Sequence, residues 1–151
     1  MNKALLMFLL FTTCVTAQKI DRETYYQYND SIEFRITSIQ KNKIVSRGNV
    51  NYIAENGRRF IGMTFQFKNN SSSTQVINFN EIYIRDKNGK LQDIDFVVMG
   101  MKITFRTDNY QHKLKAHKKK IISVEFTASF DKDEPIDELV IGEKVIALKY
   151  N

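Results

Sequence analysis

Lysines and arginines form the densest group of chemically active side chains in this sequence. Residues 113–120 read KLKAHKKK, and a second basic pair, RR, follows the Asn56-Gly57 turn. If the two groups met at one end of the fold, they would attract an anionic partner, such as a glycolipid or an acidic glycan. The alternative is an ordinary solvated, lysine-rich turn. The candidate anion-binding residues are Lys113, Lys115, His117, Lys118, Lys119, Lys120, Arg58 and Arg59.

Few residues of this chain are candidates for nucleophilic catalysis. The only cysteine is Cys14, and no Gly-x-Ser-x-Gly segment surrounds a serine. His112 and His117 are the only side chains that titrate near neutral pH without perturbation. Both lie among lysines, which would lower their pKa values. We therefore expect no catalytic residues, and we interpret both histidines as solvated loop residues.

Carboxylates gather in two places. An acidic loop spans residues 131–138 around Pro135 but has neither the glycine nor the ligand spacing of a calcium loop. Asp93 and Asp95 are two residues apart, so on a strand they would share one face, and we expect that face to meet water. The sequence thus predicts no metal site and no cofactor. The acidic residues of the loop are Asp131, Asp133, Glu134, Asp137 and Glu138.

The N-terminal residues 1–17 have the pattern of a secretory leader. Lys3 supplies the positive charge, residues 4–11 are all apolar, and Val15-Thr16-Ala17 offers a cleavage site. The apolar run is shorter than the about 20 residues needed to span a bilayer. We expect cleavage after Ala17 and a mature chain that works outside the cytoplasm, either periplasmic or secreted. The alternative, lipid attachment at Cys14, fits less well because Phe11 and Thr13 are atypical before a lipidated cysteine.

Composition limits the mature chain to one domain without disulfides. Residues 18–151 contain no cysteine, so the fold must be held by burial of apolar surface. The whole chain has a net charge of +6, which favours anionic partners or simply keeps an exported protein soluble. Nucleic acid is not expected, because Tyr110 is the only aromatic residue near the basic run and stacking on bases needs several.

Alternation of apolar and polar residues dominates the sequence from Ser31 onward. The segments 31–37, 59–68, 81–86 and 120–128 each alternate with a period of two, which indicates strands with one buried face. Turn-forming residues such as Asn88-Gly89 separate them. The pattern predicts an N-terminal arm at 18–30 and an antiparallel β-sandwich of seven to nine strands at 31–151. The expected core comprises Ile32, Phe34, Ile36, Met63, Phe65, Phe67, Ile82, Ile84, Ile122, Val124, Phe126, Leu139 and Leu148.

Several of these segments resemble the bacterial immunoglobulin-like, telokin-like extracytoplasmic domains. The strand and turn at residues 65–70, FQFKNN, are similar to that family, as is the Asp-x-x-Gly-Lys hairpin formed by Asp86, Gly89 and Lys90. The segment 114–118 stands where the family has a Leu-x-Pro-Gly-Glu turn, but Ala116 and His117 replace the proline and glycine. Phe126 matches the phenylalanine at the end of the strand that follows this turn in the family. The segment 148–150 resembles the family's last strand. The resemblance implies an immunoglobulin-like sandwich and a family of largely unassigned function.

Together these features favour a non-enzymatic binding or structural module of the bacterial cell envelope, with a glycolipid, a glycan or an envelope protein as partner. Two alternatives remain. One is a small hydrolase or metal-dependent enzyme that uses the loops 108–120 and 131–138. The other is an inhibitor-like protein that binds a partner through an exposed sheet edge.

Overall fold

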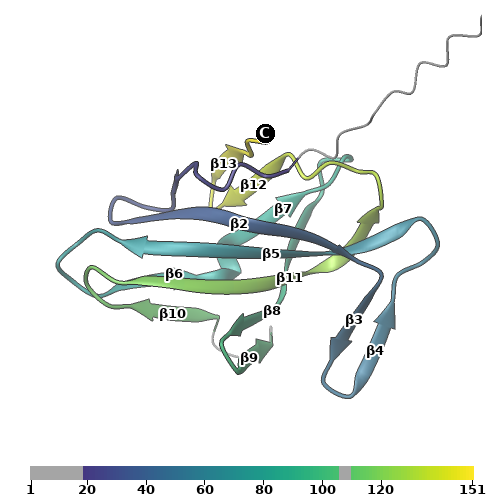
Figure 1. Cartoon of the computed structure of the whole chain (residues 1–151), viewed down its shortest axis with the longest axis horizontal. Helices are drawn as coiled ribbons and strands as arrows, with labels where there is room; N and C mark the ends of the chain where they lie inside the picture. Colours follow the sequence, from purple (N-terminus) through teal and green to yellow (C-terminus); the bar gives the residue numbers. More distant parts are fainter. Residues whose placement is uncertain (1–18, 106–109) are drawn as a thin grey trace, which may run out of the picture.

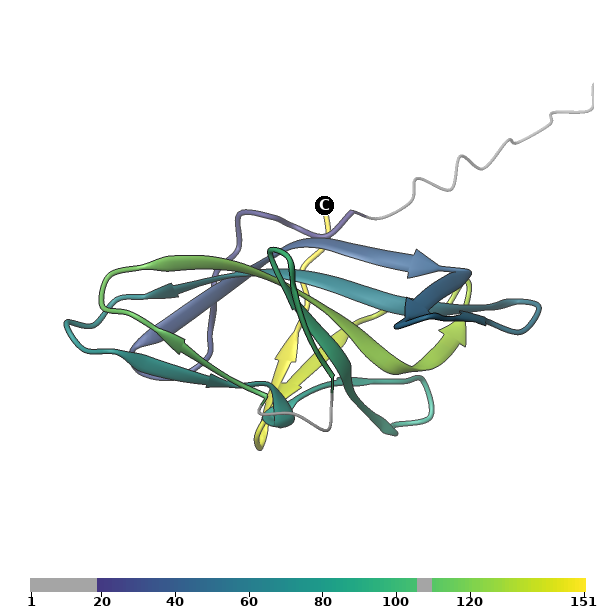
Figure 2. The same ribbon diagram turned by 90° about the horizontal axis from the view of Figure 1, so that it is seen from below.

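The computed structural model describes residues 19–105 and 110–151, so the expected leader at 1–17 lies outside the described residues. The described chain is an antiparallel β-sandwich with one short 3-10 turn, η1 (Phe79–Glu81), and no α-helix (Figures 1 and 2). The described residues form no helix that is long and apolar enough to cross a membrane. The strands are β1 (Tyr26–Gln27), β2 (Ile32–Asn42), β3 (Ile44–Arg47), β4 (Val50–Ile53), β5 (Arg58–Asn69), β6 (Gln75–Asn78), β7 (Ile82–Arg85), β8 (Leu91–Met99), β9 (Lys102–Phe105), β10 (Gln111–Leu114), β11 (Lys119–Asp131), β12 (Glu138–Ile141) and β13 (Lys144–Ala147).

One continuous sheet supplies both layers of the sandwich. Its strand order is β1-β2-β5-β11-β8-β7-β12-β13, with β9 added beside β8. The long strands β2, β5 and β11 form one layer, and β7, β12 and β13 form the opposite one (Figure 2). The pairs β6–β10 and β3–β4 complete the structure as separate two-stranded sheets. All of these pairings are antiparallel, as the alternation in the sequence predicts.

Strand β8 turns the corner between the layers. Its first residues pair with β7, where Tyr83 faces Asp93, and its later residues pair with β11, where Ser123 faces Val98. The register on β11 shifts between Glu125 and Phe126, so Asp95 is an extra residue on β8 at this point. A bulge bends a strand and redirects its side chains, which is how a strand changes layer at a sandwich corner.

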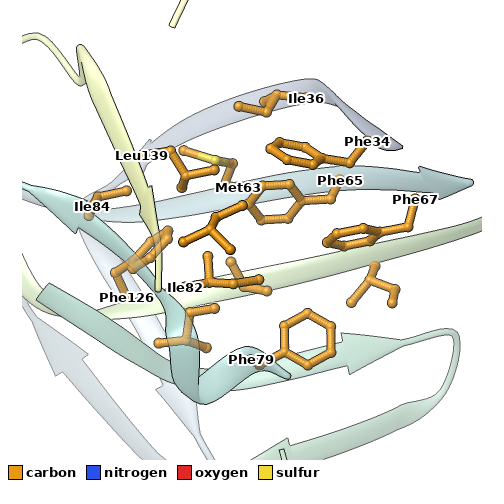
Figure 3. Packing of buried hydrophobic residues seen from close by; sticks show 14 of the residues in the cluster. Phe34, Ile36, Met63, Phe65, Phe67, Phe79, Ile82, Ile84, Phe126 and Leu139 are labelled. Carbon is orange, nitrogen blue, oxygen red and sulfur yellow. The ribbon is translucent and has the colours of Figure 1, made fainter. Parts of the chain in front are cut away.

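The core is built from the alternating residues of these strands and is rich in phenylalanine (Figure 3). All thirteen residues expected in the core are buried. Phe34, Phe65 and Phe67 form a chain of ring contacts with centroids 5.4–5.6 Å apart. Phe67 also meets Phe79 of η1 edge to face, at 6.1 Å. The Phe67–Phe79 contact joins the two layers, and the aromatic packing stabilises a domain that has no cysteine in residues 18–151.

The expected arm, residues 18–30, packs onto the sandwich from Lys19 onward. Tyr26 stacks on Phe34 at 5.6 Å, and Tyr28 meets Phe67 edge to face. Tyr25 is partly exposed. Ile20 forms a bridge with Tyr150, so the two ends of the described chain lie side by side. The arm therefore contributes to the core as well as leading into it.

Asn69 ties together two turns at one end of the sandwich. It is fully buried, and its Nδ2 donates to the carbonyl oxygens of Ser73 (2.8 Å) and Leu114 (3.0 Å). Its Oδ1 accepts from the backbone N–H and the hydroxyl of Ser71. The side chain thus satisfies groups in the β5–β6 and β10–β11 turns at once, which explains why asparagine stands at the end of β5.

Replacing Asn69 should be costly. We expect Asn69→Ala to lower the free energy of unfolding by about 2 kcal/mol, because buried carbonyl and N–H groups lose their partners. Chemical denaturation of the variant measures this change. Asn70→Ala is the matched control, since Asn70 is exposed and should change stability by less than about 0.5 kcal/mol. Equal effects at the two positions would contradict the role given to Asn69.

The structure has more strands than the expected seven to nine. The described residues form thirteen, because short segments that lack clear alternation find partners. Residues 50–53 form β4, which pairs with β3. The connection 108–119 contains β10, which pairs with β6. His117 adopts a positive φ of 55°, the conformation that favours glycine, where the resembled family has its Pro-Gly turn.

Candidate functional site

The basic residues identified in the sequence fall into two separate places. Lys119 pairs with Lys68 at the end of β5, whereas Arg58 begins β5 and pairs with Asp131. Ten residues of extended strand separate Arg58 from Lys68, which is about 33 Å. The structure therefore does not bring Arg58 and Arg59 together with the lysine run. The run itself comprises Lys113 on β10, Lys115, His117 and Lys118 in the following turn, and Lys119 and Lys120 at the start of β11.

Each basic group has a structural environment of its own. Arg58 forms an ion pair with Asp131 at 3.1 Å and donates to the Ser129 hydroxyl. The lysine run borders a shallow groove of about 590 Å³, which is lined by Lys119, Lys120, Ile121, Gln66, Val98, Gly100 and Ser123. His112 is half-buried, and its pKa is lowered first by that burial and then by the charges of Lys120 and Lys102. Lowering by positive neighbours is the direction expected from the sequence.

The acidic loop is mostly engaged in holding the fold. Glu134 is buried and accepts from the backbone N–H groups of Lys87 (2.7 Å) and Asp131 (3.2 Å). Glu138 pairs with Arg85 at 2.8 Å. Among the described residues, no three His, Cys, Asp or Glu side chains are grouped so that they could hold a metal ion.

A deeper cleft lies where the two chain ends meet the loop 131–138. It has a volume of about 610 Å³, and we call it the terminal cleft. Its apolar surface includes the buried side chains of Ile20 and Ile136 and the partly buried Ile39. Four cationic side chains border it against one carboxylate. Its lining residues are Lys19, Ile20, Arg22, Ser38, Ile39, Lys41, Lys132, Asp133, Pro135, Ile136 and Tyr150.

The polar groups of the terminal cleft are held in place by the backbone. Lys41 Nζ donates to the carbonyl oxygens of Lys132 (3.0 Å) and Glu134 (2.6 Å), which fixes the loop against β2 and leaves a positive charge at the rim. The Tyr150 hydroxyl donates to the Ile136 carbonyl. Burial raises the Tyr150 pKa to about 12, with a further contribution from Asp137. This phenol therefore stays neutral at physiological pH and adds no negative charge to the cleft.

A second unusual group lies at the corner where β8 changes layers. Glu125 faces outward on β11 opposite Gly62, yet it is only 6 % exposed. Arg47 of β3 reaches across to Asp95 with Nε 2.5 Å from Oδ2, and we call Arg47, Asp95 and Glu125 the corner cluster. Among the described residues, Glu125 Oε1 has no hydrogen-bond partner. The small Gly62 makes room for it, since a Cβ there would lie 3.0 Å from Glu125 Oε2.

The corner cluster holds two carboxylates against one guanidinium. Burial raises the pKa of Glu125 to about 7, opposed by the charge of Arg47 and by a hydrogen bond from Asn42, while Asp95 raises it further. The expectation that Asp93 and Asp95 face water is wrong for Asp95. Its side chain is 20 % exposed because the β8 bulge turns it toward Arg47. Asp93 accepts from the Thr127 hydroxyl instead.

Neither the terminal cleft nor the corner cluster was identified from the sequence. The cleft draws on four segments that are distant in sequence and contain no motif. For the corner cluster, the sequence offers one signal: an acidic residue, Glu125, lies between the core residues Val124 and Phe126 of β11. Its burial depends on a hairpin folding over the sheet, which alternation alone does not reveal.

No known family model matches this chain, and no curated protein matches it. Three solved structures share its fold. An uncharacterised β-sandwich protein from Clostridium difficile 630 is 17 % identical with a TM-score of 0.51, over 80 % of this chain and 83 % of that one. A conserved hypothetical protein from Bacillus anthracis is 14 % identical with a TM-score of 0.55, over 88 % and 96 %.

The third structure is a functionally unknown protein from Listeria monocytogenes EGD-e. It is 16 % identical with a TM-score of 0.52, over 82 % of this chain and 71 % of that one. At such identities the likeness shows the fold and says nothing about ligands. The chain is thus similar in architecture to uncharacterised bacterial β-sandwich proteins.

Proposed function

We propose that this protein is a non-enzymatic binding module that works outside the cytoplasm at a bacterial cell envelope. Its site is the terminal cleft, and its ligand is an amphipathic anion, such as a lipid or glycolipid with an acidic headgroup. The observation that carries the proposal is the lining of the cleft, where a cationic rim surrounds an apolar floor.

Each part of this ligand has a counterpart in the cleft. Ile39, Pro135 and Tyr150 offer accessible apolar surface for an acyl chain above the buried Ile20 and Ile136, and burying that surface favours binding by about 25 cal/mol per Å². Lys19, Arg22 and Lys132 stand at the rim, where a phosphate or carboxylate would meet them. Asp133 is the single carboxylate of the lining, and it lies 3.8 Å from Lys132. The expected leader and the resemblance to extracytoplasmic domains support the location.

The test uses protein expressed in bacteria with its own leader and purified from the periplasm or medium. Its mass should correspond to a chain that begins at Gln18. Dihexanoyl phosphatidic acid is titrated into it by calorimetry, with dihexanoyl phosphatidylcholine as the probe without net charge. Replacing Lys19, Arg22 and Lys132 by serine should raise the dissociation constant for the anionic probe at least about tenfold.

The matched control removes the same charge elsewhere. Lys118, Lys119 and Lys120 replaced by serine lose three positive charges at the lysine run and should bind as the unchanged protein does. If the control variant lost binding instead, the ligand would sit on the lysine run and the cleft proposal would be wrong. Equal affinity for both lipid probes would exclude recognition of charge.

A further inference from the structure

Exposed apolar side chains concentrate on two hairpins. In the described residues, seven of the twelve large exposed apolar side chains belong to the β3–β4 and β8–β9 hairpins. Met101, in the β8–β9 turn, is fully exposed, and Ile53 of β4 is 67 % exposed. These seven side chains are Ile44, Val50, Tyr52, Ile53, Met101, Ile103 and Phe105.

Both hairpins project to the same side of the molecule, away from the edge where the C-terminus lies (Figure 1). Ile44 and Ile53 are register partners, so they sit together on one face of the β3–β4 hairpin. On the other hairpin, Ile103 faces Val98 and Phe105 packs on Phe96 with ring centroids 6.0 Å apart. The exposed apolar side chains therefore lie on two separate projecting hairpins. They do not form a single flat sheet edge.

One face of the β3–β4 hairpin packs against the main sheet. Val45, Ala54 and Phe60 form a small buried cluster of their own. The Arg47 guanidinium lies over the ring of Tyr52 at 4.7 Å and over Phe60 at 5.5 Å. Since its underside is already packed, the hairpin holds its exposed side chains outward in a fixed arrangement.

Positive charges predominate near the projecting parts of these hairpins. Residues 43–54 and 96–105 contain Lys43, Arg47 and Lys102 and no aspartate or glutamate, but Arg47 is paired with Asp95 of β8, which leaves Lys43 and Lys102. A surface that combines exposed apolar side chains with positive charges only is complementary to the headgroup region of an anionic bilayer. A typical protein-binding edge would carry charges of both signs around its apolar centre.

We propose that the β3–β4 and β8–β9 hairpins dock this protein onto the surface of an anionic lipid bilayer. Two projections on one side can enter a planar interface together, with Val50, beside the β3–β4 turn, and Met101, in the β8–β9 turn, at the depth of the headgroups. The terminal cleft is a different surface, so this docking does not depend on the ligand proposed for the cleft.

Vesicle sedimentation tests the proposal with the exported protein. Vesicles made of phosphatidylcholine and phosphatidylglycerol in a ratio of about three to one are compared with vesicles of phosphatidylcholine alone. The unchanged protein should sediment with the anionic vesicles. Replacing Val50, Met101 and Ile103 by serine should weaken that binding at least about tenfold.

The chain offers a matched control for this variant. Val76, Leu91 and Val145 are also exposed apolar residues, but they lie outside residues 43–54 and 96–105, and their replacement by serine should leave vesicle binding unchanged. The serine variant of Lys19, Arg22 and Lys132 should also keep vesicle binding, which separates this test from that of the cleft. Thermal unfolding of each variant confirms that it is folded.

Three results would overturn the proposal. Failure of the unchanged protein to sediment with anionic vesicles would leave these hairpins as a surface for a protein partner. Equal loss of binding in the two apolar variants would show that the hairpins have no special role in docking. A dimer in sedimentation velocity that the hairpin variant converts to a monomer, without any effect on vesicle binding, would identify a second copy as the occupant.

Discussion

Phe67→Ala should lower the free energy of unfolding by about 4 kcal/mol, the range seen when a buried phenylalanine is truncated. Phe67 is fully buried, and its ring contacts those of Tyr28, Phe34, Phe65 and Phe79. The substitution leaves a cavity where the layers meet. Because a domain of this size is stable by only about 5–15 kcal/mol, this is a large share of the total. Urea denaturation measures the loss.

Two further variants serve as controls for the size of this stability loss. Phe67→Leu keeps most of the buried volume and should cost less than half as much. Ile121→Ala removes an apolar side chain that is more than half exposed and should change stability by less than about 0.5 kcal/mol. A small loss in Phe67→Ala would mean that the layers are not joined through this ring.

Glu125→Gln should stabilise the protein at alkaline pH and remove a pH dependence. In the folded chain the pKa of Glu125 is raised from 4.5 to about 7. Between these values the folded state keeps a proton that the unfolded state has lost, so stability falls as the pH rises and levels off above about 7. The shift corresponds to about 3 kcal/mol. Near pH 8 the variant should be more stable by up to that amount, and near pH 4 the two should be similar.

Denaturation curves across this pH range provide the measurement. Glu138→Gln is the control, because Glu138 is half-exposed in its pair with Arg85 and its loss should cost less than about 1 kcal/mol. If Glu125→Gln declined in stability between about pH 4.5 and 7 as steeply as the unchanged protein, another group would be responsible. Arg47 and Asp95 are the charged neighbours of Glu125, and both are kept in this variant.

The all-β fold was predictable because each long strand carries its own alternation. Phe65 and Phe67 on β5, like Val124 and Phe126 on β11, show which face is buried without knowledge of the partner strand. Short strands carry no such evidence. Four residues such as those of β4 become a strand only when β3 lies beside them.

The sites were less predictable than the fold. Burial of Glu125 requires Gly62 opposite it and the reach of Arg47 from another hairpin, which are contacts between distant parts of the chain. The lysine run was visible as a charge pattern, yet the sequence contained no measure of its distance from Arg58. That distance follows from the antiparallel register of β5 and β11.

The bridge between Ile20 and Tyr150 joins the segments that flank β1 and β13, the outermost strands of the sheet order. Backbone contacts between the two chain ends therefore hold these outer parts of the sheet together. They include hydrogen bonds from Asp21 N–H to the Lys149 carbonyl and from Asn151 N–H to the Lys19 carbonyl, both 2.8 Å. Bare outer strands invite other molecules to add onto them and grow into polymers. We expect that a protease trimming the last few residues would remove these contacts and favour such growth at the outer strands.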